Sequence, residues 1–164
     1  MQNQHSQIKD GTKICEKIEN SAVKSIVKSD QLVIIQMQKE AEIEETEIYS
    51  IYNSLLQNNV IVEAFEKEED KIQFRIKKAE QNKVQELLDS KYPNYKLKQK
   101  DLTKVSIVGY GITQDNIILN EVMEILQKDK VQVMNVNLTQ SKIEIIVKQI
   151  ENKTIEELHT KLIK

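Results

Sequence analysis

Apolar residues recur along this chain with two alternating spacings, one that fits helices and one that fits strands. Between residues 45 and 58 they occupy positions i, i+3, i+4, i+7 and i+8, which form one face of a helix. Between residues 71 and 76 they alternate with polar residues, as expected for a strand with one buried face. The pattern therefore predicts a chain in which short helices and short strands follow one another.

This succession of spacings occurs twice. Residues 45–93 align with residues 116–164 at a constant offset of 71 residues, without a gap across 49 positions. Only nine of the 49 aligned pairs are identical, but the spacing changes from helical to strand and back at the same places in both copies. We therefore predict an α+β fold of two tandem ferredoxin-like βαββα modules, each with an antiparallel sheet.

The expected elements of the two modules correspond to one another. In the first module we expect a strand at 32–37, a helix at 45–58, strands at 60–65 and 71–76, a second helix capped by Asn82, and a strand at 95–100. In the second module we expect a strand at 104–109, a helix capped by Asp115 or Asn116 that ends at Lys128, strands at 130–136 and 142–147, and a last helix opened by a capping box at Thr154. Residues 22–28 form a further candidate strand, followed by a turn at 29–31.

The second module has no counterpart of the strand at 95–100, because the sequence ends at its last helix. An open sheet edge exposes backbone hydrogen-bonding groups, and the candidate strand at 22–28 is available to cover it. The predicted organisation is a polar N-terminal segment at 1–20, a strand at 21–31 shared with the second module, a first module at 32–101 and a second module at 102–164. Modules this small bury little surface, so each is expected to depend on the other or on a second chain.

Composition excludes several classes of function. The 24 basic residues are interleaved with 26 acidic ones and the net charge is −2, which does not fit a surface for nucleic acid. No apolar run approaches the ~20 residues that span a bilayer, so no membrane contact is expected. The three glycines are too few for a phosphate-binding loop, and Gly109-Tyr110-Gly111 lacks the third glycine of a nucleotide motif. The single Cys15 cannot form an internal disulfide, which favours a reducing, cytoplasmic location.

The residue types that usually carry catalysis are sparse. His5, Cys15 and His159 supply neither a metal-binding set nor a nucleophile with its base, so we expect no catalytic residue, no metal and no cofactor. The glutamates between residues 40 and 47 could form an acidic site, but they also suit a helix N-terminus, where the helix dipole favours carboxylates. We favour the second interpretation.

Several stretches resemble the C-terminal regulatory region of aspartokinases, which consists of tandem ACT domains. The segments KVSIVGYGI (104–112), VQVMNVNLTQSKIEIIV (131–147) and EELHTKLI (156–163) are similar, in this order, to the last ACT module. Upstream, DGTKI (10–14) and the strand after it look like the segment that leads from the kinase domain into the regulatory pair, and residues 60–63 and 71–76 look like strands of the first ACT module. The resemblance covers residues 9–164.

The resemblance implies a non-catalytic regulatory subunit or domain in aspartate-family amino-acid biosynthesis, because the nucleotide loop of the kinase domain has no counterpart in this sequence. It also implies allosteric sensing of lysine or threonine. The implied partners are a second copy of the chain in a homodimer, a catalytic aspartokinase chain, or both. The alternative is a degenerate ACT assembly module that mediates oligomerisation without binding an effector.

In ACT modules the effector usually binds where the first strand meets the first helix, at a Pro-Gly that leaves helix amides open to the ligand carboxylate. The resemblance places ten residues at effector-binding positions: Glu44, Glu45, Thr46, Ile61 and Glu63 in the first module, and Thr113, Gln114, Asp115, Asn116 and Gln132 in the second. Neither module keeps the Pro-Gly, and Ile117 would crowd a ligand in the second. The acidic residues of the first module would attract an ammonium group, so lysine at the first module is the expected effector.

Overall fold

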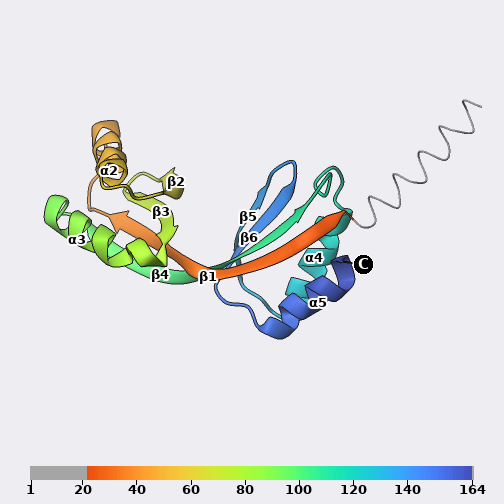
Figure 1. Cartoon of the computed structure of the whole chain (residues 1–164). Coiled ribbons are helices and arrows are strands. Elements are labelled where there is room, and N and C mark those ends of the chain that lie inside the picture. The colour runs from red at the N-terminus through yellow and green to blue at the C-terminus, as the bar shows by residue number, and fades with distance from the viewer. Residues whose placement is uncertain (1–21, 164) are drawn as a thin grey trace, which may run out of the picture. The chain divides into compact units, whose positions relative to one another are not determined.

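The computed structural model describes residues 22–163, and Figure 1 shows the course of the chain. The polar segment at 1–20, with His5, Cys15 and the DGTKI stretch, lies outside the described residues. The elements are, in order, β1 (Val23–Gln38), α2 (Glu45–Gln57), β2 (Glu63–Lys67), β3 (Lys71–Lys77), a 3₁₀ helix η1 (Lys78–Glu80), α3 (Gln81–Lys91), β4 (Lys96–Gly109), α4 (Ile117–Lys128), β5 (Val133–Leu138), β6 (Lys142–Val147) and α5 (Asn152–Leu162).

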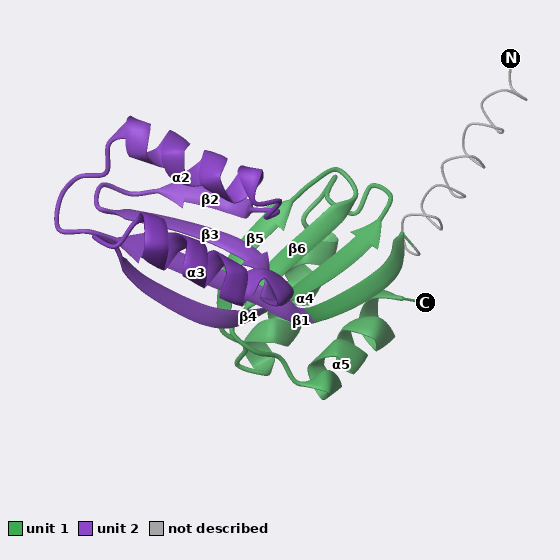
Figure 2. Cartoon of the chain, turned by 60° about the vertical axis from the view of Figure 1, so that its left-hand side comes forward, with its two compact units in different colours: residues 1–29, 103–164 green, residues 30–102 purple. Residues whose placement is uncertain are grey.

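The chain forms two compact units, which Figure 2 draws in different colours. Unit 1 comprises residues 1–29 and 103–164, and unit 2 comprises residues 30–102. Both long strands take part in both units: β1 gives its first part to unit 1 and its last part to unit 2, whereas β4 does the reverse. The chain therefore passes between the units along continuous strands rather than through a linker.

Unit 2 is a four-stranded sheet with two helices. Its strand order is β2-β3-β1-β4, and β3 pairs antiparallel with both β1 and β2. The apolar faces of α2 and α3 join alternate residues of the strands in one core. That core consists of Val33, Ile35, Met37, Ile43, Ile51, Leu55, Val60, Ile72, Phe74, Ile76, Val84 and Leu88. The burial of Ile72, Phe74 and Ile76 follows the alternation predicted from the sequence.

Unit 1 repeats this architecture with the strand order β1-β4-β6-β5 and the helices α4 and α5. Its β6 pairs antiparallel with both β4 and β5. The N-terminal part of β1 completes the sheet, because Ala22, Val23 and Ile26 are buried in the same core as Val105 and Ile107 of β4. The predicted fold class, two ferredoxin-like βαββα modules with the N-terminal strand completing the second, is therefore confirmed.

The repeat extends to details of the backbone that the side chains did not reveal. Asn59 and Lys130, which are equivalent at the offset of 71, both have a left-handed backbone with φ of 59° and 56°. In both copies the next residue donates its amide to a carbonyl five residues earlier, which closes the end of α2 and of α4 in the same way. The register shifts within residues 63–66 of β2 and within residues 133–135 of β5, and these stretches overlap at the offset of 71. Both copies therefore end their first helix in the same way.

Two of the predicted strand boundaries are wrong. The predicted turn at 29–31 is part of the uninterrupted strand β1, and the strands predicted at 95–100 and 104–109 are one strand, β4. The stretch at 29–31 contains neither glycine nor proline, and Asp30 and Gln31 are exposed. Its polarity therefore reflects a solvent-exposed part of a strand and not a turn.

The strands after the first helix of each module begin three residues later than predicted. The predictions were 60–65 and 130–136, whereas β2 spans Glu63–Lys67 and β5 spans Val133–Leu138. The cause is the way each helix ends. The residue after the left-handed Asn59 or Lys130 donates its amide hydrogen bond back to the helix, so the first residues of the predicted strands close the helix instead of pairing in the sheet.

Two predicted helix caps are also wrong. Asn82 lies inside α3, because η1 leads directly into the helix at Gln81. Thr154 is the third residue of α5, and its buried hydroxyl donates to Asp129 Oδ2 at 2.7 Å. Both residues match the capping pattern, but α3 begins one residue before Asn82 and α5 begins two residues before Thr154.

The contact that holds β1 in unit 1 can be tested at Gly109. A Cβ atom at this position would lie 2.0 Å from the carbonyl oxygen of Ala22 and 2.7 Å from Ile112 Cγ2. We expect Gly109→Ala to lower the free energy of unfolding by about 1–3 kcal/mol, measured by urea denaturation, because a backbone segment has to move. Lys100→Ala, which removes an exposed side chain from the same strand, is the control. A Gly109→Ala variant as stable as the control would mean that residue 22 does not pack there.

Candidate functional site

The start of α2 is capped by two of its own glutamates. Glu44 is the N-cap residue, and its side chain accepts a hydrogen bond from the amide of Glu47. In return the Glu47 carboxylate accepts a hydrogen bond from the Glu44 amide at 2.8 Å. This capping box satisfies amides that a helix start leaves without partners. The acidic cluster at these two positions is therefore a helix-start feature, as favoured from the sequence.

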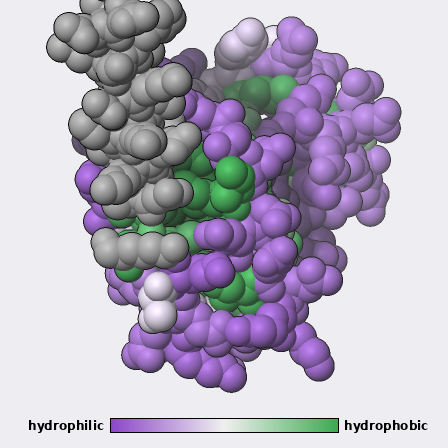
Figure 3. Space-filling model, turned by 90° about the vertical axis from the view of Figure 1, so that its right-hand side faces the viewer, coloured by the Kyte–Doolittle hydropathy of each residue, from purple (hydrophilic) through white to green (hydrophobic). Residues whose placement is uncertain are grey.

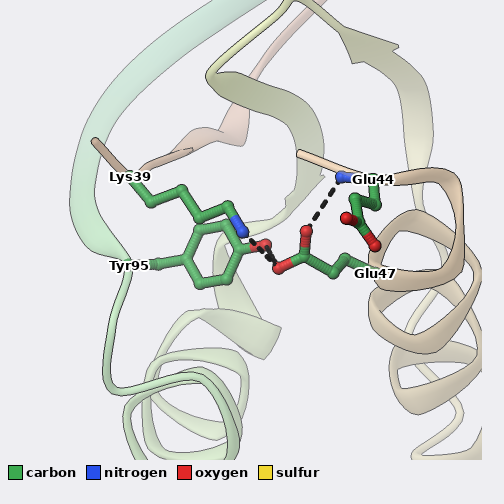
Figure 4. A network of polar contacts seen from close by, with 4 residues as sticks. All are labelled: Lys39, Glu44, Glu47 and Tyr95. Carbon is green, nitrogen blue, oxygen red and sulfur yellow. Dashed lines mark hydrogen bonds and ion pairs between the residues drawn. The ribbon is translucent and has the colours of Figure 1, made fainter. Parts of the chain in front are cut away.

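Glu47 also joins three segments of unit 2, as Figure 4 shows. Its Oε1 atom lies 2.5 Å from Lys39 Nζ, directly after β1, and accepts a hydrogen bond of 2.9 Å from the hydroxyl of Tyr95, directly before β4. The Lys39 ammonium lies 5.7 Å from the centre of the Tyr95 ring. The side chains of Lys39 and Glu47 are 20% and 30% exposed. Donors from three segments therefore converge on one partly shielded carboxylate.

These contacts shift two pKa values. The hydrogen bond from Lys39, helped by those from the Glu44 amide and Tyr95, lowers the pKa of the Glu47 carboxyl below its ordinary value of 4.5. Burial, together with the hydrogen bond to the Glu47 carboxylate, raises the pKa of the Tyr95 hydroxyl well above its usual range. At neutral pH Glu47 is therefore ionised and Tyr95 is a neutral hydrogen-bond donor.

The first-module residues predicted for effector binding fall into two groups. Residues 44–46 lie together at the exposed start of α2, and the loop before them is bonded to the turn that precedes Lys71. Glu63 is the first residue of β2 and pairs with Arg75 of β3. Arg75 lies four residues beyond Lys71, which is roughly 13 Å at the rise of a strand. Ile61 precedes β2 and is 65% exposed. The structure of unit 2 thus does not bring Glu63 and Ile61 to the start of α2.

Four of the second-module residues lie in the loop between β4 and α4. Thr113 Oγ1 donates to the carbonyl oxygen of Thr139 at 2.7 Å, which fixes this loop to the turn between β5 and β6. Asp115 Oδ1 accepts a hydrogen bond from the Ile117 amide at 2.9 Å. Asn116 is the N-cap residue of α4, but its side chain makes no capping bond. The cap predicted at Asp115 or Asn116 is thus supplied by Asp115.

A cavity of about 140 Å³ lies beside this loop. Its lining includes Gln114 and Asp115 from the loop, Glu121 from α4 and Lys161 from α5. Carboxylates and an ammonium group therefore line the same small cavity, as the two charges of an amino acid would require. Lys161 was not singled out from the sequence, because nothing in its surroundings shows that α5 ends beside this loop.

Gln132 lies apart from this cavity. It is exposed, and its carbonyl oxygen accepts a hydrogen bond from the amide of Lys148 at 3.1 Å. It lines a different cavity, of about 350 Å³, together with Asp129 and Thr154. In both modules, then, the predicted set separates into a group at the helix start and a group at the strand that follows the helix.

Sequence reasoning missed two further residues of the Glu47 network. Lys39 and Tyr95 are 56 positions apart, and no local pattern connects them. The spacing of Glu44 and Glu47 did contain a signal, because an acceptor followed three residues later by glutamate is the capping-box pattern. The sequence analysis assigned a capping box to Thr154, which lies inside α5, and did not assign one to Glu44, where the structure has it.

The described part of the chain contains neither a metal-binding cluster nor a membrane-spanning helix. Among residues 22–163 no group of three or more His, Cys, Asp or Glu side chains is arranged to hold a metal ion. No helix in this range is long and apolar enough to cross a membrane. Figure 3 shows a face that is mostly hydrophilic, with apolar side chains at the surface in a few places. The large apolar residues exposed in unit 1 are Val27, Tyr110, Ile117, Met134, Val136 and Leu138.

Comparison with known proteins identifies the fold. The sequence matches no protein-family model and shows no significant match to a curated protein. Among solved structures, the regulatory subunit of aspartate kinase from Thermus thermophilus superimposes with a TM-score of 0.73 at 14% identity, over 85% of this chain and 99% of that one. A structure of aspartokinase alpha and beta subunits gives a TM-score of 0.69 at 15% identity, over 85% and 98% of the two chains.

This chain has the fold of an aspartate kinase regulatory subunit. Aspartokinase III from E. coli, solved with aspartate and ADP, gives a TM-score of 0.66 at 11% identity, over 87% of this chain but only 34% of the enzyme. The likeness is thus to whole regulatory subunits and to a part of a complete kinase. The resemblance seen in the sequence is confirmed at the level of the tandem ACT fold.

The Glu47 network predicts how stability depends on pH. Because the folded state lowers the pKa of Glu47, its contribution is present above the unfolded value of 4.5 and is lost as the pH falls through the folded value. We expect Glu47→Gln to reduce the free energy of unfolding by roughly 0.5–1.5 kcal/mol at neutral pH. The difference from wild type should shrink in urea denaturation at about pH 3.5.

The control for this experiment is Glu45→Gln, which neutralises an exposed carboxylate in the same helical turn. It should change stability much less at neutral pH, because exposed charges contribute little. Equal effects of the two variants, or an undiminished Glu47→Gln effect in acid, would contradict the network.

Proposed function

We propose that this chain is a non-catalytic regulatory subunit or domain of the aspartate kinase type. The observation that carries the proposal is the superposition with separate regulatory subunits over 98–99% of their length. Separate regulatory subunits are matched over nearly their whole length, and E. coli aspartokinase III over only 34% of its length, which supports a role without catalysis. The cytoplasmic location expected from Cys15 belongs to the same proposal.

The proposed mechanism is a shift between arrangements of an assembly. An amino acid that binds one arrangement more tightly than another favours it by the difference in binding free energy, and a catalytic partner responds to that change. The partner we propose is a catalytic aspartate kinase chain, with a homodimer of this chain as part of the assembly. The solved alpha and beta subunits are a protein in which two kinds of chain occur together.

For the effector we propose lysine or threonine, bound at the loop of unit 1. The cavity there has Lys161 for a carboxylate, and Asp115 and Glu121 for an ammonium group. The residues of the loop, Thr113, Gln114, Asp115 and Asn116, are the predicted effector-binding residues that support this location. The corresponding start of α2, with Glu44, Glu45 and Thr46, is already capped by glutamates and is the weaker candidate for a carboxylate.

The alternative function is an assembly module that binds no effector. Two observations favour it: the capped start of α2, and Ile117, an apolar residue that lines the unit 1 cavity and is 63% exposed. An apolar side chain offers no polar contact to an amino acid. The two functions differ in one measurable property, which is amino-acid binding.

We expect the purified chain to form a complex with a catalytic aspartate kinase chain from the same cell, detected by light scattering coupled to gel filtration. The chain alone should not phosphorylate aspartate. Lysine or threonine at millimolar concentration should change the kinase activity of the complex and should bind in calorimetry, with Asp115→Ala weakening binding by about tenfold, the loss of one charge-assisted contact.

Two outcomes would decide against the proposal. A chain that remains a monomer at all concentrations and binds no catalytic chain would remove the regulatory function. A stable complex that binds neither amino acid, and whose activity neither amino acid changes, would leave the assembly module as the function. Glu124→Ala on the exposed side of α4 is the control for Asp115→Ala, since it removes a carboxylate away from the loop cavity.

A further inference from the structure

Glu47 has more partners than a helix cap requires. A capping box needs only the reciprocal contacts between the N-cap residue and the third helical residue. Here the same carboxylate also receives the ammonium group of Lys39 at 2.5 Å and the hydroxyl of Tyr95 at 2.9 Å. An amide, an ammonium and a phenol from three segments are arranged as they would be around a bound carboxylate ligand (Figure 4).

We propose that Glu47 acts as an internal ligand: its carboxylate occupies an anion-binding position built by Lys39, Tyr95 and the start of α2. Because the chain itself fills this position, the carboxylate of a free amino acid is excluded from it. The exposed carboxylates of Glu44 and Glu45 strengthen the exclusion, since a second anion at the helix start would be repelled by both.

The repeat shows that this device belongs to one module alone. At the offset of 71, Glu47 corresponds to Ile118, and Lys39 corresponds to Gly109, because the amides of both bond to equivalent carbonyls, those of Asp70 and Ser141. The first turn of α4 contains no acidic residue, whereas that of α2 contains Glu45 and Glu47. The two helix starts therefore differ in chemistry: at α2 the carboxylate of Glu47 also receives Lys39 and Tyr95, whereas at α4 the carboxylate of Asp115 accepts a hydrogen bond from the Ile117 amide.

This difference has a consequence that rests on the proposed function. If the chain regulates a kinase, unit 2 is held constantly in its carboxylate-occupied form, and a free effector acts through unit 1. The assignment of Glu47 as an internal ligand does not itself depend on the regulatory function, because it concerns contacts within unit 2.

The test removes the internal ligand and supplies a free one. In Glu47→Ala, we expect the melting temperature of the chain to fall by about 2–4 °C, the shift that a loss of about 1 kcal/mol causes in a chain of this length whose units share strands. Sodium acetate should then raise the melting temperature of this variant more than sodium chloride of equal ionic strength does, because acetate binds the vacated position in the folded state only. Acetate and chloride should act alike on wild type.

Two variants serve as matched controls. Glu47→Gln fills the position with a neutral side chain of the same shape, so acetate should give no rise beyond that of chloride. Glu45→Ala removes an exposed carboxylate from the same turn and should also show no specific acetate effect. An acetate effect that is equal in all variants, or absent in Glu47→Ala, would overturn the proposal.

A second measurement covers the case in which Glu47→Ala does not melt cooperatively. Broadening of the acetate methyl signal in NMR, recorded with folded protein, should appear with Glu47→Ala and disappear when Lys39→Met is added. Broadening that persists without Lys39, or that wild type shows equally, would contradict the internal ligand. Since both tests use the chain alone, their failure is distinct from a failure to associate with a kinase chain.

Discussion

The packing of the first residues of β1 against the end of β4 is the contact on which the rest of the structure depends. Gly109 has no Cβ, and only for that reason can the carbonyl of Ala22 lie where a side chain would otherwise begin. Ala22, Val23 and Ile26 then complete the core of unit 1, and the same strand continues into the core of unit 2 at Val33. The N-terminal strand is thus a structural part of both units.

This arrangement follows from the size of the modules. A unit of this size buries a smaller fraction of its surface than a larger domain does, and an open sheet edge would leave backbone groups without partners. Sharing β1 and β4 removes an edge from each unit without adding residues. It also couples the units along the chain, because neither β1 nor β4 can leave one unit without disturbing the strand that it gives to the other.

Elements with a strong hydrophobic period were predictable from the sequence. The helix expected at 45–58 is α2, and the alternating run at 71–76 is β3, because one buried face fixes which residues are apolar. The long strands were not predictable, because a polar stretch such as 29–31 has the same sequence pattern whether it forms a turn or an exposed part of a strand. The late start of β2 was hidden for another reason: it depends on the left-handed backbone of Asn59, which a sequence pattern does not fix.

The candidate site shows the same limit more sharply. The acidic cluster at the start of α2 was visible in the sequence, and its role at the helix start followed from the helix dipole. Its partners were not visible, because Lys39 and Tyr95 reach Glu47 only when the ends of β1 and β4 lie beside the helix. Local chemistry can be predicted from local sequence, but a site assembled from three segments requires the topology.

The two modules share an architecture and differ in the side chains at the starts of their first helices. A repeat that began with equal copies would place equal demands on both helix starts, yet α2 begins with three glutamates and α4 begins with none. Carboxylates at a helix start stabilise the helix and also repel a free anion, so the glutamates of α2 have both effects. At α4 the amides are capped only through Asp115, and a charged cavity lies beside them. Under the proposed function, stability and ligand binding compete for the same helix amides, and each module serves one of them.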